Sequence, residues 1–280
     1  MIEAVPPFRL RPGLRDARTT STLGALVALG LSLSRRGILV VLALCIVVLT
    51  TVGMSAFAFV LASQSRSASV YHVPIITSNA LAYGGGFWLA LASASRALRR
   101  DRDSGVRDLF AMRARSLGSY LTARIGGLAV LLALAVGGGT LVGGLFAMAA
   151  RSDVAARTAH ATLAAVVFAL AFAVLMAPVA LAAVGARSRF GGLMTLLTVV
   201  ALPELVVRAF ASVLPQGVAS VLAIPSALAT LRGALMPGQV DALSALRALV
   251  ALTVFGAIAI ALVRRNAILI MQHTHQELDR

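Results

Sequence analysis

The stretch GILVVLALCIVVLTTVGMSAFAFVLA, residues 37–62, contains no charged side chain. A helix needs about 20 apolar residues to cross the hydrocarbon core of a bilayer, and this stretch is longer than that. Three further uncharged stretches meet the same requirement, at residues 73–95, 125–150 and 161–186. In lipid, backbone polar groups must be paired within a helix or a closed barrel, and these continuous runs lack the alternation of barrel strands. The sequence therefore predicts an all-α, polytopic integral membrane protein.

The composition of the chain agrees with this class and excludes several others. Of its 280 residues, 59% are hydrophobic and only 12% are charged, with a mean hydropathy of +0.93. A soluble domain has about 25% charged residues, so a soluble globular enzyme is excluded. All 25 basic residues are arginine. Without lysine the chain has no conventional P-loop, so an ATP-driven reaction would place ATP and Mg²⁺ on another subunit.

Catalytic and metal-binding residues are not expected on this chain. The sequence contains neither an H-E-x-x-H nor a G-x-S-x-G motif. His72 and His160 fall at the edges of outer loops, whereas the H-T-H triplet at 273–275 falls in the C-terminal tail. These histidines do not converge on one metal site. We therefore expect a protein that is not an enzyme and carries no cofactor of its own.

The last third of the sequence is less regular. A fifth span is predicted at about 190–210 and a sixth at about 242–263. Between them, Pro215, Gly217 and Pro225 interrupt the apolar sequence, which favours short helices that dip into the membrane. An alternative with seven spans makes residues 211–231 a full crossing.

The distribution of arginine predicts the orientation in the membrane, because Lys/Arg-rich loops stay in the cytoplasm. With six spans, nineteen arginines fall on the side that holds both termini and six on the other side. Both termini are therefore expected in the cytoplasm. The N-tail arginines are expected to face anionic lipid headgroups rather than nucleic acid. The sequence thus predicts three parts of the chain: an N-tail at 1–36, a transmembrane domain at 37–263 and a C-tail at 264–280. The N-tail includes a possible interfacial helix at 22–34. The transmembrane domain includes a cytoplasmic loop at 96–124.

The cytoplasmic loop is the most informative connection in the chain. Residues 96–127 read RALRRDRDSGVRDLFAMRARSLGSYLTARIGG. The positive-inside rule accounts for its arginines, but it does not account for the apolar residues Leu109, Phe110 and Met112. A short apolar patch between charges, preceded by a Ser-Gly turn, is typical of a small helix offered to a cytoplasmic partner.

This loop resembles that of the permease subunits of type-2 ATP-binding-cassette (ABC) exporters. In that family an acidic residue, a glycine, a short leucine-rich segment, a proline, a basic residue and a Tyr-Leu-x-Gly-Arg/Lys-like segment connect the second and third spans. Here the order is kept by Asp101 and Asp103, Gly105, the segment 108–110, Arg115 and the segment 119–126. Aspartate replaces the usual glutamate, and Arg113 lies near the expected proline.

The resemblance implies a half-transporter. It would pair with a second permease copy or a homologue, and with cytoplasmic ABC ATPase subunits that hold ATP and Mg²⁺. The loop would receive the nucleotide-driven motion. Its implied coupling residues are Asp101, Asp103, Gly105, Asp108, Leu109 and Phe110.

Glu204 is the one acidic residue in a predicted span region, four residues before Arg208. This order suits an ion pair along a helix, and an intramembrane acid is also a candidate for a substrate or proton pathway.

Two glycine motifs each allow two interpretations, one of packing within the chain and one of a functional role. Gly139 and Gly143 could pack within the chain or in a dimer, and the glycines at 84–86 could bend a span or pack closely.

The expected function is that of a permease subunit in an ABC exporter. The arginine-only basic set and the abundant alanine and glycine point to a GC-rich bacterial genome, hence to the bacterial inner membrane. The alternative is an ATP-independent secondary transporter or a membrane accessory protein. Ion-coupled carriers usually keep carboxylates near the middle of the membrane, and this sequence has none there, which favours the exporter.

Overall fold

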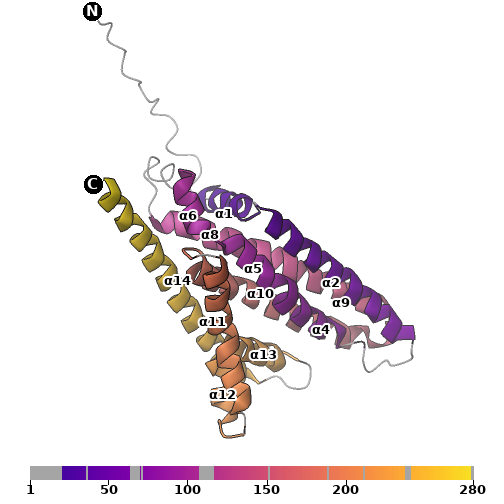
Figure 1. Cartoon of the computed structure of the whole chain (residues 1–280). Coiled ribbons are helices and arrows are strands. Elements are labelled where there is room, and N and C mark those ends of the chain that lie inside the picture. The colour runs from indigo at the N-terminus through magenta and orange to yellow at the C-terminus, as the bar shows by residue number, and fades with distance from the viewer. Residues whose placement is uncertain are drawn as a thin grey trace, which may run out of the picture.

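The structure is a computed structural model, and it describes residues 21–35, 37–63, 70, 72–106, 117–150, 152–187, 189–210, 212–236 and 241–278. All regular secondary structure within these ranges is helical (Figure 1). Six helices in the described ranges are long and apolar enough to cross a membrane. The predicted all-α class is thus confirmed for the described residues, and the number of helices able to span a membrane equals the predicted number of spans.

The first four spans form an elongated bundle (Figure 1). Their helices are α2 (Ile38–Ser63); α4 (Val73–Asn79), η1 (Ala80–Gly86) and α5 (Phe87–Ala94); α8 (Leu117–Leu132), η2 (Ala133–Gly137) and α9 (Gly138–Ala150); and α10 (Ala155–Val184), which follows the short helix η3 (Ser152–Val154). The fourth span is central: 67% of its apolar segment is buried, whereas the corresponding share for α2 is 22%. It packs against α4, α5, α8 and α9 and carries much of the core.

The last third holds two long helices and two short ones. These are α11 (Arg189–Ala209), α12 (Gln216–Leu222), α13 (Ile224–Ala234) and α14 (Ala242–Leu278). A seventh span would require one long helix within 211–231, but extended backbone at Ala223 (φ −126°, ψ 146°) separates α12 from α13. The last helix continues past the expected end at 263. The pair at 264–265 ends the apolar run without ending the helix, because both arginines are exposed and arginine is a good helix former.

Asp241 caps the first turn of α14. Its Oδ1 accepts hydrogen bonds from the backbone amides of Leu243 (3.0 Å) and Ser244 (3.3 Å), and the hydroxyl of Ser244 donates to Oδ2 (2.5 Å). Such caps satisfy amides that have no partner within the helix. The hydrogen bonds from Ser244 lower the pKa of Asp241 below its ordinary value, because they favour the charged carboxylate.

Many serine and threonine side chains within the spans form hydrogen bonds inside their own helices. Many hydroxyls donate to the carbonyl oxygen four residues earlier, a pairing that satisfies the hydroxyl without a second helix. This pattern holds for Thr50, Thr51, Ser55, Thr77, Thr140, Thr162, Thr198 and Thr253. These hydroxyl groups can therefore lie within the spans at little cost in free energy.

Glycines let the spans approach closely. A Cβ at Gly139 would lie 2.7 Å from the hydroxyl oxygen of Thr51, and a Cβ at Gly143 would lie 3.1 Å from the methyl carbon of Thr77. Both glycines of the G-x-x-x-G motif thus face helices of the same chain, as the packing interpretation predicts. A Cβ at Gly86 would lie 3.0 Å from the ring of Phe172. This glycine packs closely too, and it ends the π-helical segment η1, which lies against the second one, η2.

A helix is present in the segment for which the sequence predicts an interfacial helix. α1 (Ser21–Ser34) packs along the beginning of α8 (Figure 1). The two backbones touch at Gly30 and Gly127. A Cβ on Gly30 would overlap the carbonyl oxygen of Ala123, and a Cβ on Gly127 would overlap the backbone of Gly30 and Leu31. Only glycine fits at this crossing.

Candidate functional site

The second span breaks where it leaves the bundle. Its helix α5 ends at Ala94, and Arg96 adopts a left-handed backbone (φ 56°), which is uncommon for a residue other than glycine. A new short helix, α6 (Ala97–Asp103), begins directly after it. Gly105 (φ 66°) follows α6 in the left-handed conformation that favours glycine at the end of a helix. The chain therefore forms a separate helix at this end of the span.

One face of α6 rests on the end of the central helix. The backbone amide of Leu98 donates to the carbonyl oxygen of Gly185, directly after α10, at 3.2 Å. A Cβ at Gly185 would lie 3.1 Å from Cγ of Leu98 and 2.5 Å from the carbonyl oxygen of Leu181. Glycine at this position lets α6 approach the fourth span.

The same face of α6 carries a buried ion pair. Asp101 is 1% exposed and Arg124, from α8, is 3% exposed. Nε of Arg124 donates to Oδ2 of Asp101 at 2.5 Å, Nη2 donates to Oδ1, and the hydroxyl of Tyr120 donates to Oδ2 at 2.6 Å. Bidentate pairs of this kind are strong and fix geometry. We call these three residues the Asp101 cluster, which fastens α6 to the third span.

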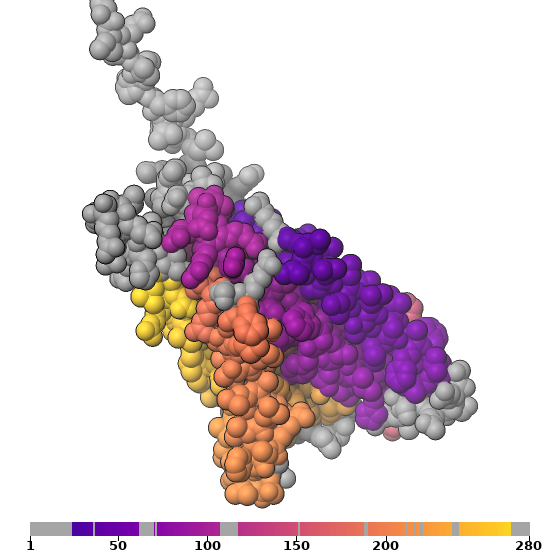
Figure 2. All heavy atoms as spheres, in the orientation of Figure 1, coloured from indigo at the N-terminus to yellow at the C-terminus, as the bar shows by residue number. Residues whose placement is uncertain are grey.

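The opposite face of α6 is solvent-accessible and mainly basic. Arg99 and Arg100 are exposed, and the side chain of Asp103 is 65% exposed and pairs with Arg102 at 3.3 Å. In Figure 2, α6 lies toward one end of the described part of the molecule. Residues on this face can meet a partner, whereas Asp101 cannot, because its carboxylate is enclosed.

The predicted coupling residues fall into three groups. Asp101 is buried, whereas Asp103 and Gly105 lie at the accessible end of α6. The other three, at 108–110, lie outside the described residues. The buried partners Tyr120 and Arg124 were part of the family-like segment, but no signal in the sequence paired them with Asp101.

A second polar cluster joins α11 to the short helix α13. Glu204 and Arg208 form the ion pair that their spacing favours, with Nε to Oε1 at 2.9 Å. The other carboxylate oxygen of Glu204 accepts a hydrogen bond from the hydroxyl of Ser226 at 2.6 Å. The Glu204 side chain is 17% exposed and that of Arg208 is 75% exposed. The bond to Ser226 is therefore the more protected of the two contacts.

A Ser226→Ala substitution is expected to cost about 1–3 kcal/mol, because it leaves a mostly buried carboxylate oxygen without its donor. Arg208→Gln should cost only about 0–1 kcal/mol, as is usual for an exposed ion pair. Thermal unfolding of the two variants in detergent measures both effects. A larger loss for Arg208→Gln would contradict this ranking.

Arg232 of α13 was not among the sequence candidates. Its Nη1 donates to Oδ1 of Asn79 at 2.7 Å and to the hydroxyl of Ser78 at 3.3 Å, and its guanidinium lies 4.7 Å from the ring centroid of Phe168. These contacts tie α13 to the second and fourth spans. The sequence predicted that Arg232 lies in an outer loop, because the neutral groups that it contacts are far from it in the sequence.

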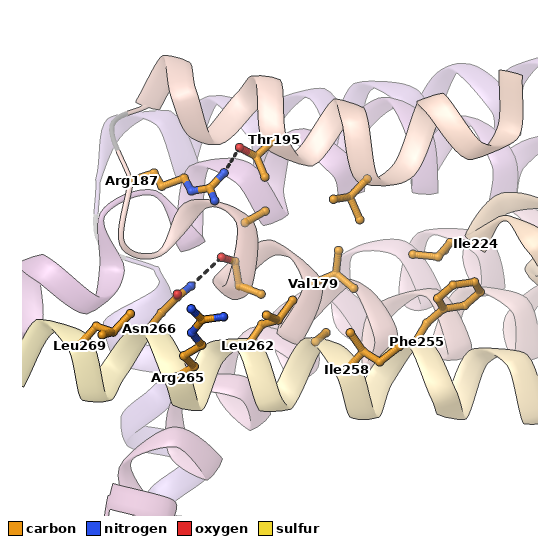
Figure 3. Close-up of a pocket in the computed structure, with 14 residues that line it drawn as sticks. Val179, Arg187, Thr195, Ile224, Phe255, Ile258, Leu262, Arg265, Asn266 and Leu269 are labelled. Carbon is orange, nitrogen blue, oxygen red and sulfur yellow. Dashed lines mark hydrogen bonds between the residues drawn. The ribbon is translucent and has the colours of Figure 1, made fainter. Parts of the chain in front are cut away.

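A cavity of about 370 Å³ opens between α10, α11 and α14 (Figure 3). Arg187, Thr195, Arg265 and Asn266 lie toward one end, and a guanidinium nitrogen of Arg187 donates to the hydroxyl of Thr195. The amide of Asn266 donates to the carbonyl oxygen of Ala182 at 3.0 Å. The other end is lined by apolar side chains. The cavity is therefore amphipathic.

Comparisons with protein-family models, curated proteins and solved structures found no match to this chain. Among the described residues, no three histidine, cysteine, aspartate or glutamate side chains lie together as possible metal ligands. A functional assignment therefore rests on the geometry of α6 and on the resemblance of its sequence.

Proposed function

We propose that the chain is the transmembrane permease subunit of an ABC exporter in the bacterial inner membrane. ATP hydrolysis would occur on a separate cytoplasmic ABC ATPase subunit that binds ATP and Mg²⁺, and a second permease copy or a homologue would complete the pathway. The observation that carries the proposal is the attachment of α6 (Ala97–Asp103). This short helix is fixed to the second, third and fourth spans where they end together.

The attachment of α6 suits the transmission of motion. The helix follows the second span after the break at Arg96, contacts the third span through the Asp101–Arg124 pair, and contacts the fourth through the carbonyl of Gly185. A displacement of α6 by closing ATPase subunits would therefore tilt several spans together. Rigid-body tilting of packed helices is a common way to exchange two states of a protein.

The arrangement of the helices supports cytoplasmic termini and membrane-dipping helices. In Figure 1, α1, α6 and the final turns of α14 lie toward one end of the molecule, and α12 and α13 lie toward the other. The first end carries α6, which belongs to the arginine-rich loop that the positive-inside rule assigns to the cytoplasm. α12 and α13 have 7 and 11 residues, which is too short to cross a bilayer.

A second permease copy has an apolar surface available. In both α2 and α11, only 22% of the apolar segment is buried within one chain. Ile38, Leu49 and Phe190 are each more than 70% exposed. Lipid or a second chain must cover these side chains.

The test is purification of the tagged protein from its native host in a mild detergent. An ABC ATPase subunit, identified by mass spectrometry and by vanadate-sensitive ATP hydrolysis, is expected to co-purify. A variant with Arg99→Glu and Arg100→Glu, and one with Leu109→Asp and Phe110→Asp, should lose this activity. Arg157→Glu is the control, because Arg157 is exposed at the opposite end of α10.

All variants must elute and unfold like the native protein for the comparison to hold. If no ATPase accompanies the native chain in several detergents, the proposal is wrong. An ATP-independent transporter or accessory protein would then take its place. If the α6 variants keep the ATPase, the partner docks elsewhere.

A further inference from the structure

The cavity between α10, α11 and α14 has two chemically different ends (Figure 3). Arg187, Arg265 and Asn266 gather at the end near Leu269. Val179, Ile224 and Phe255 line the other end. The volume of about 370 Å³ lies within the range of about 300–1,000 Å³ that is usual for small-molecule sites. The cavity can thus hold a ligand with one polar and one apolar end.

The polar end carries two arginines whose charge no acidic side chain of the described residues neutralises. No aspartate or glutamate lines the cavity, and neither Arg187 nor Arg265 forms an ion pair within the described part of the chain. A guanidinium has five N–H donors, and Arg187 uses one of its nitrogens on Thr195. Donors and charge therefore remain for an anionic group such as a phosphate.

The apolar end excludes most water-soluble anions as a fitting ligand. Its side chains are aliphatic or aromatic and offer neither a donor nor an acceptor. A free phosphate would use the arginines and leave this part unfilled. An acyl chain would cover it, and each buried methylene group contributes about 0.8 kcal/mol.

We propose that this cavity binds an anionic phospholipid from the membrane leaflet on the α6 side. Its phosphate accepts hydrogen bonds from Arg187 and Arg265, and one acyl chain lies along Val179 and Phe255 between α11 and α14. Basic pockets between transmembrane helices are typical binding sites for anionic headgroups. The proposal concerns a lipid held by one chain, so it does not depend on an ATPase partner.

The simpler alternative is that both arginines only reach toward bulk headgroups, as arginines near helix ends commonly do. Arg264 separates the two explanations. It neighbours Arg265 on α14 and is also exposed, but it does not line this cavity. Bulk attraction depends on all three arginines alike, whereas the proposed site depends on Arg187 and Arg265.

The experiment measures lipid binding to the full chain, delipidated in a neutral detergent. Phosphatidylglycerol is titrated while native mass spectrometry counts bound lipids and thermal unfolding reports stabilisation. Inorganic phosphate, diacylglycerol and phosphatidylcholine are titrated separately. The native protein should bind one phosphatidylglycerol in preference to these three.

Matched variants test each end of the cavity. Arg187→Gln combined with Arg265→Gln should weaken binding at least about tenfold, equivalent to about 1.4 kcal/mol, and Arg264→Gln should leave it unchanged. Val199→Trp should block the apolar part from the exposed side of α11. Val206→Trp is its control, because Val206 is similarly exposed on α11 and does not line the cavity.

Three results would overturn the proposal. Equal weakening by Arg264→Gln would show bulk attraction, and full stabilisation by inorganic phosphate would remove the role of the acyl chain. Unchanged binding by the double arginine variant would exclude the site. A normal unfolding temperature without added lipid shows that a variant is folded, so misfolding is distinguishable from lost binding.

Discussion

An Asp101→Ala substitution is expected to destabilise the protein by about 3–5 kcal/mol, because it leaves the charge of Arg124 buried without a partner. Arg124 is 3% exposed, and within the described part of the chain Asp101 is the carboxylate with which its guanidinium pairs. The hydroxyl of Tyr120 loses its acceptor in the same substitution. Thermal or denaturant unfolding in detergent measures the loss.

Two controls separate the buried pair from general charge effects. Asp103→Ala removes an exposed aspartate two residues away on α6, so it should change stability by less than about 1 kcal/mol. The triple variant Asp101→Leu, Tyr120→Phe and Arg124→Met replaces the whole cluster by apolar groups. It should recover most of the stability, because a buried ion pair can often be replaced by apolar residues of similar volume.

The triple variant also tests the transmission of motion. If the Asp101 cluster acts only in folding, a stable apolar replacement should support normal ATPase stimulation and export in the assembled transporter. If its fixed, bidentate geometry positions α6, the replacement should be stable and yet weakly coupled. A destabilised triple variant together with a neutral Asp101→Ala would contradict the structure of this cluster.

The sequence predicted the fold where the absence of charged residues alone marks a membrane-spanning helix. Four spans could be found as uncharged runs, because a lipid-facing helix excludes unpaired charge. The rule fails where a charge is paired inside the protein. The third span was expected to begin at 125, but its helix begins at Leu117 and includes Arg124, whose charge Asp101 neutralises. Arg232 was missed for a different reason, because the neutral groups that it contacts belong to helices distant in the sequence.

The candidate site was only partly predictable. The sequence located the loop that contains α6 (Ala97–Asp103), and its turn at Gly105 was readable from the Ser-Gly pair. Which aspartate faces inward depends on contacts with α8 and α10, over twenty residues and more than eighty residues away. The amphipathic cavity was not predicted, because its three helices are brought together only in the folded chain.

A Gly127→Leu substitution is expected to separate α1 from α8. A Cβ at Gly127 would overlap the backbone of Gly30 and Leu31, and backbone atoms cannot rotate away as a flexible side chain can. Overpacking commonly costs about 1–3 kcal/mol, and this clash belongs at or above the upper limit because no neighbouring side chain can yield. Gly24→Leu, on the partner helix α1, is the control, since a Cβ there meets nothing within 4 Å.

A disulfide can report the contact directly. A Cβ at Gly126 would lie 3.1 Å from Cγ2 of Val27, so cysteines at these two positions are close enough to be joined after small adjustments. The native Cys45 is exposed on α2 and is first replaced by alanine. Oxidation should then link Val27→Cys to Gly126→Cys in the otherwise native chain and in Gly24→Leu, but not in Gly127→Leu. Efficient linkage in Gly127→Leu would mean that α1 still packs on α8 at this position, and that the close approach of the two helices does not require glycine at 127.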